Sequence, residues 1–357
     1  MTTRPRLRDL GITIGNYPTG PHNAITDVSG VAVGHTTLIY DEPRVARTGV
    51  TTILPRPLDP LYKNLCYAGY HSFNGNGEMT GMHWLAESGM LGGIVAITNT
   101  HQVGVVRDAL VEHEITHYPE TAWCLPVVAE TYDGWLNDIA AFHLKKEHVF
   151  AAIDSATTGA VAEGNVGGGT GMICHGFKGG IGTSSRLVKT AGEEYTVAAL
   201  VQANYGDFDQ LRIDGVSVKK LLGNAWEGGR PAKPTGISSS IIVVIATDAP
   251  LVGDQCKRLA QRATVGVARV GGTGHNGSGD IFLAFATGND LPAKATIPIP
   301  IRTVPASQMS ELMDAAADAV QESILNALCA AQTLTGFQGR TVYALPTENL
   351  AQMLRTS

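Results

Sequence analysis

The chain has 357 residues, of which 44% are hydrophobic and 16% are charged, a composition typical of a globular protein with a sizeable core. Its formal net charge is −6 and Lys and Arg do not cluster, which argues against nucleic-acid binding, because a phosphate backbone demands a basic stripe. The first residues lack an apolar signal segment and no run of about 18 apolar residues occurs, so we expect a cytoplasmic protein without membrane association.

The predicted elements mix strands and helices along the chain. Short apolar, β-branched runs bounded by Gly, Asn or Pro predict buried strands at 92–98, 195–202, 240–247 and 280–287. Apolar residues at helical spacing predict helices at 82–91, 104–115, 253–263 and 308–332. The last of these carries one apolar face, made of Met313, Ala317, Val320, Ile324, Ala327 and Leu328. Because the strands and helices do not alternate strictly, the pattern favours a layered α+β fold over a doubly wound sheet.

The segment 223–238 differs from the rest of the chain because it is dense in Gly, Pro and polar residues. It leads directly into Ser240 and the predicted strand 240–247. Such a segment is ordinarily a surface loop that only connects two elements. The alternative is a loop that is cut, which would leave Ser240 at a new N-terminus.

One segment has the zinc-peptidase pattern H-E-x-x-H, with His113 and His117 on one face of a predicted helix. Pro119 ends that helix directly afterwards, and the nearest candidate for a third ligand, Glu130, lies in a predicted strand-to-turn segment. The five cysteines are scattered and form no C-x-x-C pair, so neither a thiolate zinc site nor a disulfide framework is expected. We therefore expect neither a metal nor another cofactor.

Two glycine-rich segments have the spacing of nucleotide-binding motifs in the wrong context. The residues after 272–277 predict a strand, whereas a dinucleotide site needs a helix whose N-terminus holds the pyrophosphate. The run 167–171 lacks the Lys-Ser/Thr ending of a phosphate loop. Either segment could still form an anion-accepting turn.

The sequence contains no G-x-S-x-G nucleophile elbow, and no ordered Ser, Asp and His set stands out. The remaining route to a hydrolase is a nucleophile whose own α-amine serves as the general base. An α-amine titrates at about pH 7.7 to 8.0 in model peptides, which suits proton transfer near neutral pH. Ser240 has the required setting, at the head of a strand after a loop.

Seven blocks of the chain carry a resemblance to a known family: 74–89, 97–110, 126–139, 164–186, 200–206, 240–251 and 276–287. Together they resemble the DmpA and β-peptidyl aminopeptidase (BapA) family of self-processing serine aminopeptidases, over nearly the whole chain. The resemblance implies a four-layer αββα sandwich that cuts itself into an α chain, 1–239, and a β chain, 240–357. Both chains would belong to a single domain, with the nucleophile opening a central strand.

The same resemblance implies roles for individual residues. Ser240 matches the nucleophile of self-cleavage and of catalysis. The family usually has Gly or Asn before the cut, whereas this chain has Ser238 and Ser239, so Ser239 is the alternative first residue.

Five further residues match family positions around the nucleophile. Ser278 and Asp280 are expected to orient the nucleophile and its amine, although some members carry the longer Glu at the position of Asp280. Asn204 and Tyr132 match donors to the oxyanion that forms during the reaction. Glu130 matches a carboxylate that pairs with the free ammonium of the substrate.

The expected activity is release of an N-terminal L-, D- or β-residue from short peptides, amides or esters, through an acyl-enzyme on Ser240. The resemblance also implies a homotetramer of αβ units. Three alternatives stay open: an acyl transferase like ornithine acetyltransferase, which usually has a Thr nucleophile, a zinc peptidase using His113 and His117, and a binding scaffold that has lost processing.

Overall fold

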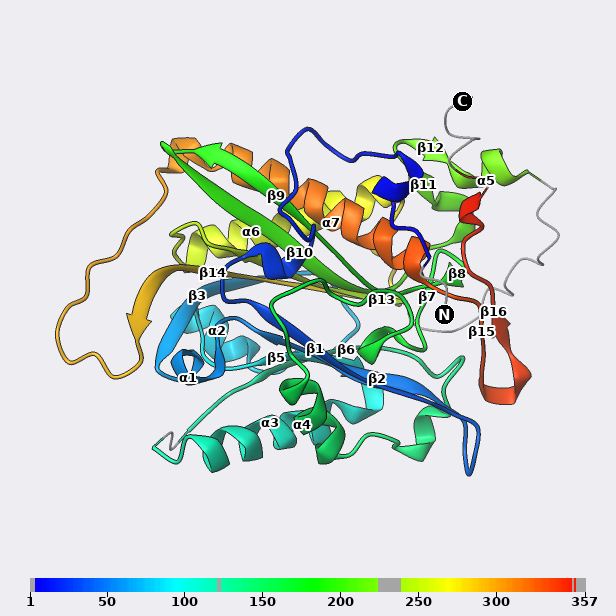
Figure 1. The fold of residues 1–357 in the computed structure, drawn as a ribbon, viewed down its shortest axis with the longest axis horizontal. Helices are drawn as coiled ribbons and strands as arrows, with labels where there is room; N and C mark the ends of the chain where they lie inside the picture. Colours follow the sequence, from blue (N-terminus) through cyan, green and yellow to red (C-terminus); the bar gives the residue numbers. More distant parts are fainter. Residues whose placement is uncertain (1–3, 121–122, 224–238, 349, 351–357) are drawn as a thin grey trace.

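The computed structural model describes residues 4–120, 123–223, 239–348 and 350. Two main β-sheets lie face to face, and helices cover the outer face of each sheet (Figure 1). The chain is therefore the α+β, four-layer αββα sandwich that the resemblance implies. The candidate processing loop, apart from Gly223, lies outside the described residues.

The first sheet has four described strands, in the order β1 (Ala32–Tyr40), β2 (Ala46–Leu54), β5 (Val95–Asn99) and β6 (Val127–Thr131). Neighbouring strands run antiparallel except β5 and β6, which are parallel. Helices α3 (Val103–His117) and α4 (Lys146–Asp154) cover its outer face (Figure 1). The apolar side chains of α3 and α4 form a core with the outward-facing residues of these strands.

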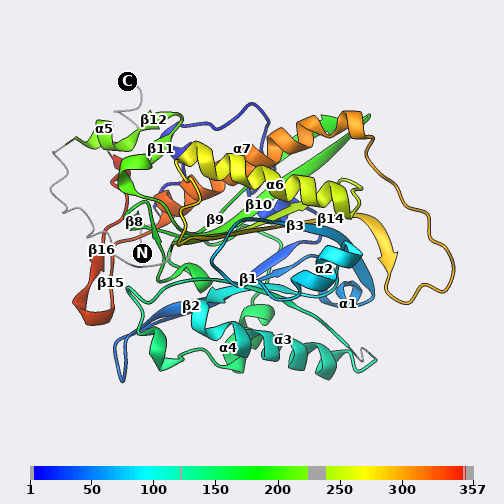
Figure 2. The same ribbon diagram turned by 180° about the vertical axis from the view of Figure 1, so that it is seen from behind.

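The second sheet has six described strands, in the order β4 (Met90–Leu91), β3 (Asn64–Gly75), β14 (Gly279–Pro292), β13 (Ser240–Thr247), β10 (Glu193–Asn204) and β9 (Gly180–Thr190). Here β13 and β14 are the parallel pair. Helices α6 (Gly253–Val270) and α7 (Ser310–Ala330) cover its outer face, as Figure 2 shows from behind.

Strand β13 lies between two layers of core. Ile241, Val243 and Ile245 belong to the core shared with α6 and α7. Ile242, Val244 and Ala246 belong to the core between the two sheets. Burial on both faces explains the uninterrupted apolar run that predicts this strand. The alternation also places the side chain of Ser240 on the same face as Ile242, toward the first sheet.

The remaining described α-helices and strands are short: α1 (Leu58–Leu61), α2 (Met82–Ser88), α5 (Val218–Leu222), β7 (Ile173–Cys174), β8 (Phe177–Lys178), β11 (Arg212–Ile213), β12 (Val216–Ser217), β15 (Leu334–Thr335) and β16 (Thr341–Val342). Within the described ranges, no helix is both long and apolar enough to cross a membrane.

All four predicted strands and all four predicted helices form; β13 has the predicted bounds, and the other elements have shifted ends. The prediction of a helix over 82–91 is wrong at its end, because Gly89 takes a positive φ of 67° and the next two residues pair with β3 as strand β4. Helix α6 runs past the predicted end, to Val270. Helix α7 is buried nearly all round, including Glu322 and Asn326, rather than along a single face.

Candidate active site

Three strand ends of the second sheet bring Ser240 and its neighbours together. Ser240 opens β13, lies beside Gly279 at the start of the parallel strand β14, and pairs with Asn204 at the end of the antiparallel strand β10. The serine is 2% exposed. Its Oγ donates to the carbonyl oxygen of Ser239 at 2.7 Å and accepts from the Gly279 N–H at 3.2 Å. The hydroxyl therefore lies directly beside the peptide bond that precedes it.

Ser278 and Asp280 flank Gly279 and form a buried pair. The Ser278 hydroxyl donates to Asp280 Oδ1 at 2.6 Å. Burial raises the pKa of Asp280 to about 6, against the opposing effects of the Ser278 hydroxyl and the Ile241 N–H. The pair thus reaches the nucleophile through backbone groups on either side of it, since Ile241 follows Ser240 and the Gly279 N–H donates to Ser240 Oγ.

The side-chain amide of Asn204 is held in one orientation. Its Oδ1 accepts from the Ile173 N–H at 2.8 Å, and its Nδ2 donates to the Tyr132 carbonyl oxygen at 3.0 Å. An amide nitrogen has two hydrogens, so one donor is left for a ligand beside Ser240. Tyr132 reaches Asn204 through its backbone, whereas its hydroxyl packs against Gly134, where an added Cβ would lie 2.3 Å from the hydroxyl oxygen.

Glu130 lies at the end of β6 in the first sheet and is 3% exposed. It accepts from the Glu78 N–H at 3.0 Å and from the Thr100 hydroxyl. Burial raises the pKa of this carboxyl, against the effects of those two donors. A Cβ added to Gly77 would lie 3.2 Å from both Glu130 Oε1 and the Gly279 Cα. Gly77 therefore fills the space between Glu130 of the first sheet and Gly279 of the second.

The turn that ends β3 is a part of the site that the sequence did not predict. Asn74 Nδ2 donates to the Ser278 carbonyl oxygen, and the Asn76 N–H donates to the same atom at 3.2 Å. Asn76 Nδ2 donates to the Gly277 carbonyl oxygen at 2.9 Å. These amides hold the loop that carries Ser278. The repeated Asn-Gly pairs of 74–77 are a sequence signal for such a turn.

Polar side chains also join the two sheets behind the site, and these too were not predicted. Gln202 donates to the Thr98 carbonyl oxygen and to the Thr131 hydroxyl, both at 2.9 Å. Thr131 in turn donates to the Met172 sulfur at 2.8 Å. The signal lay in the polar residues Gln202 and Asn204, two apart on an otherwise apolar strand and therefore on one face.

The two glycine-rich segments have structural roles. In the run 167–169, the three N–H groups donate to Thr37, Thr51 and Val166, so the anion-accepting turn considered for this run is not open. Segment 272–277 leads into β14, as predicted, and the Gly272 N–H donates to the Val267 carbonyl oxygen.

The H-E-x-x-H segment forms the end of α3, which stops at His117. The rings of His113 and His117 stack with centroids 4.2 Å apart, and His117 Nδ1 lies 2.8 Å from the His113 carbonyl oxygen. Burial raises the pKa of Glu114 to about 7. In the part of the chain that the structure describes, no three His, Cys, Asp or Glu side chains are grouped closely enough to hold a metal ion.

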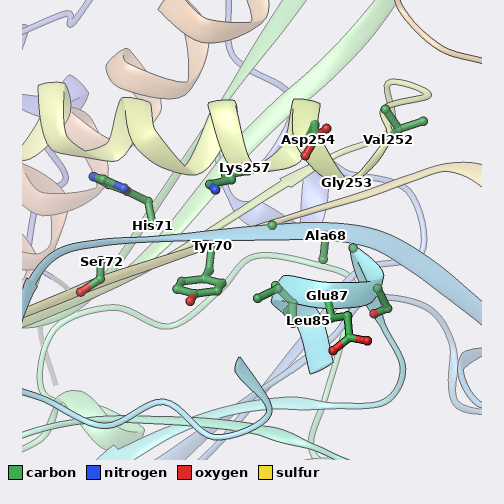
Figure 3. Close-up of a pocket in the computed structure, with 14 residues that line it drawn as sticks. Ala68, Tyr70, His71, Ser72, Leu85, Glu87, Val252, Gly253, Asp254 and Lys257 are labelled. Carbon is green, nitrogen blue, oxygen red and sulfur yellow. The ribbon is translucent and has the colours of Figure 1, made fainter. Parts of the chain in front are cut away.

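A separate pocket of about 430 Å³ lies along the open edge of β3, between α2 and the start of α6 (Figure 3). Tyr70, His71 and Lys257 are among the side chains that line it. None of the predicted site residues lines this pocket, so it is distinct from the cluster around Ser240.

A serine at the start of a central strand, in one of two stacked sheets, is the arrangement of the N-terminal-nucleophile hydrolases. Comparison with known proteins agrees with this class. The structure superposes with a TM-score of 0.92 on the L-aminopeptidase D-Ala-esterase/amidase of Ochrobactrum anthropi, described as a prototype of the serine aminopeptidases and a variant of the Ntn hydrolase fold. The two are 45% identical and each is covered over 99% of its length. A Burkholderia sp. β-aminopeptidase gives a TM-score of 0.91 at 49% identity, with 99% of both chains covered.

The chain belongs to peptidase family S58, whose model matches residues 23–342. It is 47% identical to the β-peptidyl aminopeptidase BapA of Sphingosinicella microcystinivorans, over 98% of this chain and 92% of that protein. It is 44% identical to BapA of Sphingosinicella xenopeptidilytica, over 98% and 91%. The chain is therefore an aminopeptidase, as predicted, and the matches favour this activity over the acyl transferase, zinc peptidase and scaffold alternatives.

Proposed function

We propose that the chain is a precursor that cuts itself between Ser239 and Ser240, and that Ser240 then serves as the N-terminal nucleophile of the aminopeptidase. The observation that carries the proposal is the position of Ser240 Oγ, which hydrogen-bonds to the carbonyl oxygen of the preceding residue at the head of a buried central strand. The products would be residues 1–239 and 240–357, associated in one four-layer domain.

Self-cleavage follows from the groups around that peptide bond. Ser240 Oγ attacks the Ser239 carbonyl carbon, the C–N bond to Ser240 breaks, and the hydroxyl proton passes to the departing nitrogen. Water then hydrolyses the resulting ester, which restores the hydroxyl and leaves a carboxylate on Ser239. The Gly279 N–H donates to the Ser239 carbonyl oxygen at 2.9 Å, where negative charge develops, so it is placed to stabilise the oxyanion.

In the mature enzyme the new α-amine of Ser240 would take the proton from its own hydroxyl. The hydroxyl would attack the substrate carbonyl, and the free N–H of Asn204 would stabilise the oxyanion. The amine would return the proton to the leaving group, and water would hydrolyse the acyl-enzyme. The Ser278 and Asp280 pair, through its contacts on both sides of Ser240, would keep the nucleophile and its amine oriented.

The substrate class rests on Glu130 and on the relatives. A buried carboxylate near the start of β14 would pair with the free ammonium of a substrate, which an internal peptide segment lacks. We infer short peptides, amides or esters with a free N-terminus. The names of the relatives support β-amino acid peptides first, and L-residue peptides or D-residue amides and esters second.

We also propose a homotetramer of αβ units in the cytoplasm. The segment 293–305, which follows β14, supports assembly, because it exposes apolar side chains: Ile297 is 76% exposed and Ile301 is 37% exposed. Five free cysteines are consistent with a reducing compartment. Light scattering of the purified protein and fractionation of the source cells test the two statements.

The deciding experiment is intact mass with N-terminal identification of the purified protein. The proposal expects two chains in place of one of 37.5 kDa, with Ser240 as the new first residue. Ser240→Ala should leave the chain whole and inactive, whereas the matched change Ser239→Ala should still yield the new Ser240 terminus. A wild-type chain that stays whole and still releases N-terminal residues would refute the mechanism.

A further inference from the structure

Lys178, in strand β8, is a fully buried cation that the proposed mechanism does not use. Its ammonium donates to the carbonyl oxygens of Gly169 at 3.2 Å, Met172 at 2.9 Å and Gly179 at 2.8 Å. Among the described residues its charge has no carboxylate partner. Burying an unpaired cation is costly, so its presence calls for a reason beyond packing.

The geometry favours the charged form of this lysine. Burial lowers the pKa of Lys178 to about 7. Three carbonyl oxygens accept from Nζ, however, and only the protonated ammonium has the three N–H groups that this requires. Three directed hydrogen bonds also hold the ammonium at one point in the fold.

One peptide group connects Lys178 to the candidate oxyanion donor. The carbonyl oxygen of Met172 accepts from Lys178 Nζ and from the Gly179 N–H, both at 2.9 Å. The N–H of the same peptide plane, on Ile173, donates to Asn204 Oδ1 at 2.8 Å. Asn204 in turn pairs with Ser240 across β10 and β13. The positive charge is therefore linked to the nucleophile's neighbour by two consecutive hydrogen bonds and one peptide unit.

We propose that Lys178 is a positioning residue for Asn204, acting through the peptide between Met172 and Ile173. This inference rests on the proposed function, in which Asn204 stabilises the oxyanion. The lysine has two effects on the amide. It holds the peptide so that an N–H, and not a carbonyl, faces Asn204, which keeps Oδ1 on Ile173 and Nδ2 on the Tyr132 carbonyl oxygen, with the second Nδ2 hydrogen left to donate. It also polarises the chain of hydrogen bonds, and each such bond strengthens the next by roughly 10–30%.

The competing explanation is purely structural, with Lys178 only tying together the backbone of 169–179. The two explanations differ in their coupling to Asn204. A positioning role predicts that loss of Lys178 matters little once the Asn204 amide is gone. A structural role predicts the same loss of activity whether or not that amide is present.

The test is a double-mutant cycle with Lys178→Met and Asn204→Ala, with activity counted per mole of free N-terminal Ser240. We expect Asn204→Ala to lower kcat on the order of 10²-fold or more, and Lys178→Met to lower kcat roughly 10-fold with KM nearly unchanged. In the Asn204→Ala background, Lys178→Met should change kcat less than about 3-fold. The control Lys189→Met makes the same chemical change at an exposed site on β9 and should have no effect.

Three outcomes would overturn the inference. Equal losses in both backgrounds, or a loss confined to KM, would show a structural role while leaving the proposed function intact. A wild-type kcat in Asn204→Ala would overturn both the inference and the oxyanion role assigned to Asn204. If Lys178→Met does not fold, Lys178→Gln provides the second variant, because it removes the positive charge and keeps an N–H donor at this position. It should lower kcat and lose that effect in the Asn204→Ala background, and an undiminished effect there would equally overturn the inference.

Discussion

Each of the two main sheets contains one described parallel pair, and the two pairs contribute opposite ends to the site. In the second sheet β13 and β14 begin there, with Ser240 beside Gly279. In the first sheet β5 and β6 end there, with Asn99 beside Thr131 and Glu130 one residue earlier. Gly77 fills the space between Glu130 and Gly279, which shows how closely the two ends approach.

The two ends offer different chemistry because a strand is directional. At the start of β14 the Gly279 N–H is directed at the Ser239 carbonyl and at Ser240 Oγ, so this end suits a nucleophile and a developing anion. At the end of β6 the Glu130 carboxylate offers acceptors, which suit a substrate ammonium. We therefore expect changes at the second-sheet end to lower kcat, and changes at the first-sheet end to raise KM.

The largest effect after loss of Ser240 itself should come from Asn204→Ala. Removing one donor to an oxyanion typically costs about 2.7–4 kcal/mol, or roughly 10²- to 10³-fold in kcat. Steady-state kinetics on a β-amino acid amide would measure it. Asn165→Ala, which removes a half-buried amide that contacts Gln332 instead, should keep wild-type kcat. A change in KM alone for Asn204→Ala would show that Asn204 binds the substrate and does not stabilise the oxyanion.

A smaller effect, on KM, is expected from Glu130→Gln. A hydrogen bond to a charged group contributes about 1.5–3 kcal/mol, so KM for a substrate with a free amine should rise roughly 10- to 100-fold. The exposed carboxylate of Glu87 gives the matched control, and Glu87→Gln should leave KM unchanged. Equal losses for substrates with free and with acetylated N-termini would contradict the assigned role of Glu130.

The pH dependence of kcat should report the ionisation of the Asp280 carboxyl. Burial raises the pKa of this carboxyl to about 6, so the folded protein takes up its proton as the pH falls through that value. If the ionised pair orients Ser240, kcat should fall by about tenfold per pH unit below pH 6. Asp280→Asn should remove this limb of the profile, and the exposed Asp254→Asn should keep it.

The raised pKa of Asp280 affects stability in the opposite direction to kcat: a lower pH lowers kcat but favours the folded state. Between the ordinary pKa of 3.8 and about 6, the folded chain holds a proton that the unfolded chain has lost. The contribution of Asp280 to the free energy of unfolding is therefore greatest below pH 3.8 and decreases as the pH rises toward 6. Denaturant unfolding of wild type and Asp280→Asn across this range would measure the difference, and a contribution that grows with pH would show that the shift has the other sign.

The smallest expected effect is none at all, at α3. His117→Ala and incubation with a chelator should leave kcat and KM at wild-type values, because both parallel pairs act without the H-E-x-x-H segment. A loss of activity that added Zn²⁺ restores would show that the reaction depends on a metal ion and contradict the role of Ser240.

The sequence was sufficient for the elements whose residues are buried on both faces. Strands β10, β13 and β14 have continuous apolar runs because each lies between two cores, and such runs are visible without a structure. Strand β3 was not predicted, since its residues are partly exposed and polar, and its pairing with β14 joins segments about 200 residues apart.

The candidate nucleophile and its family partners could also be predicted from the sequence, because Ser240, Asn204, Ser278, Asp280 and Glu130 all lie in the blocks that resemble the family. How those residues are held in place became apparent only from the fold. Gly77 lies where no side chain fits. The amides of Asn74 and Asn76 and the ammonium of Lys178 donate to backbone carbonyls, which every residue has, so the sequence does not show which carbonyls they meet. Which of these groups meet depends on contacts between distant strand ends, and those are fixed by the packing of the two sheets.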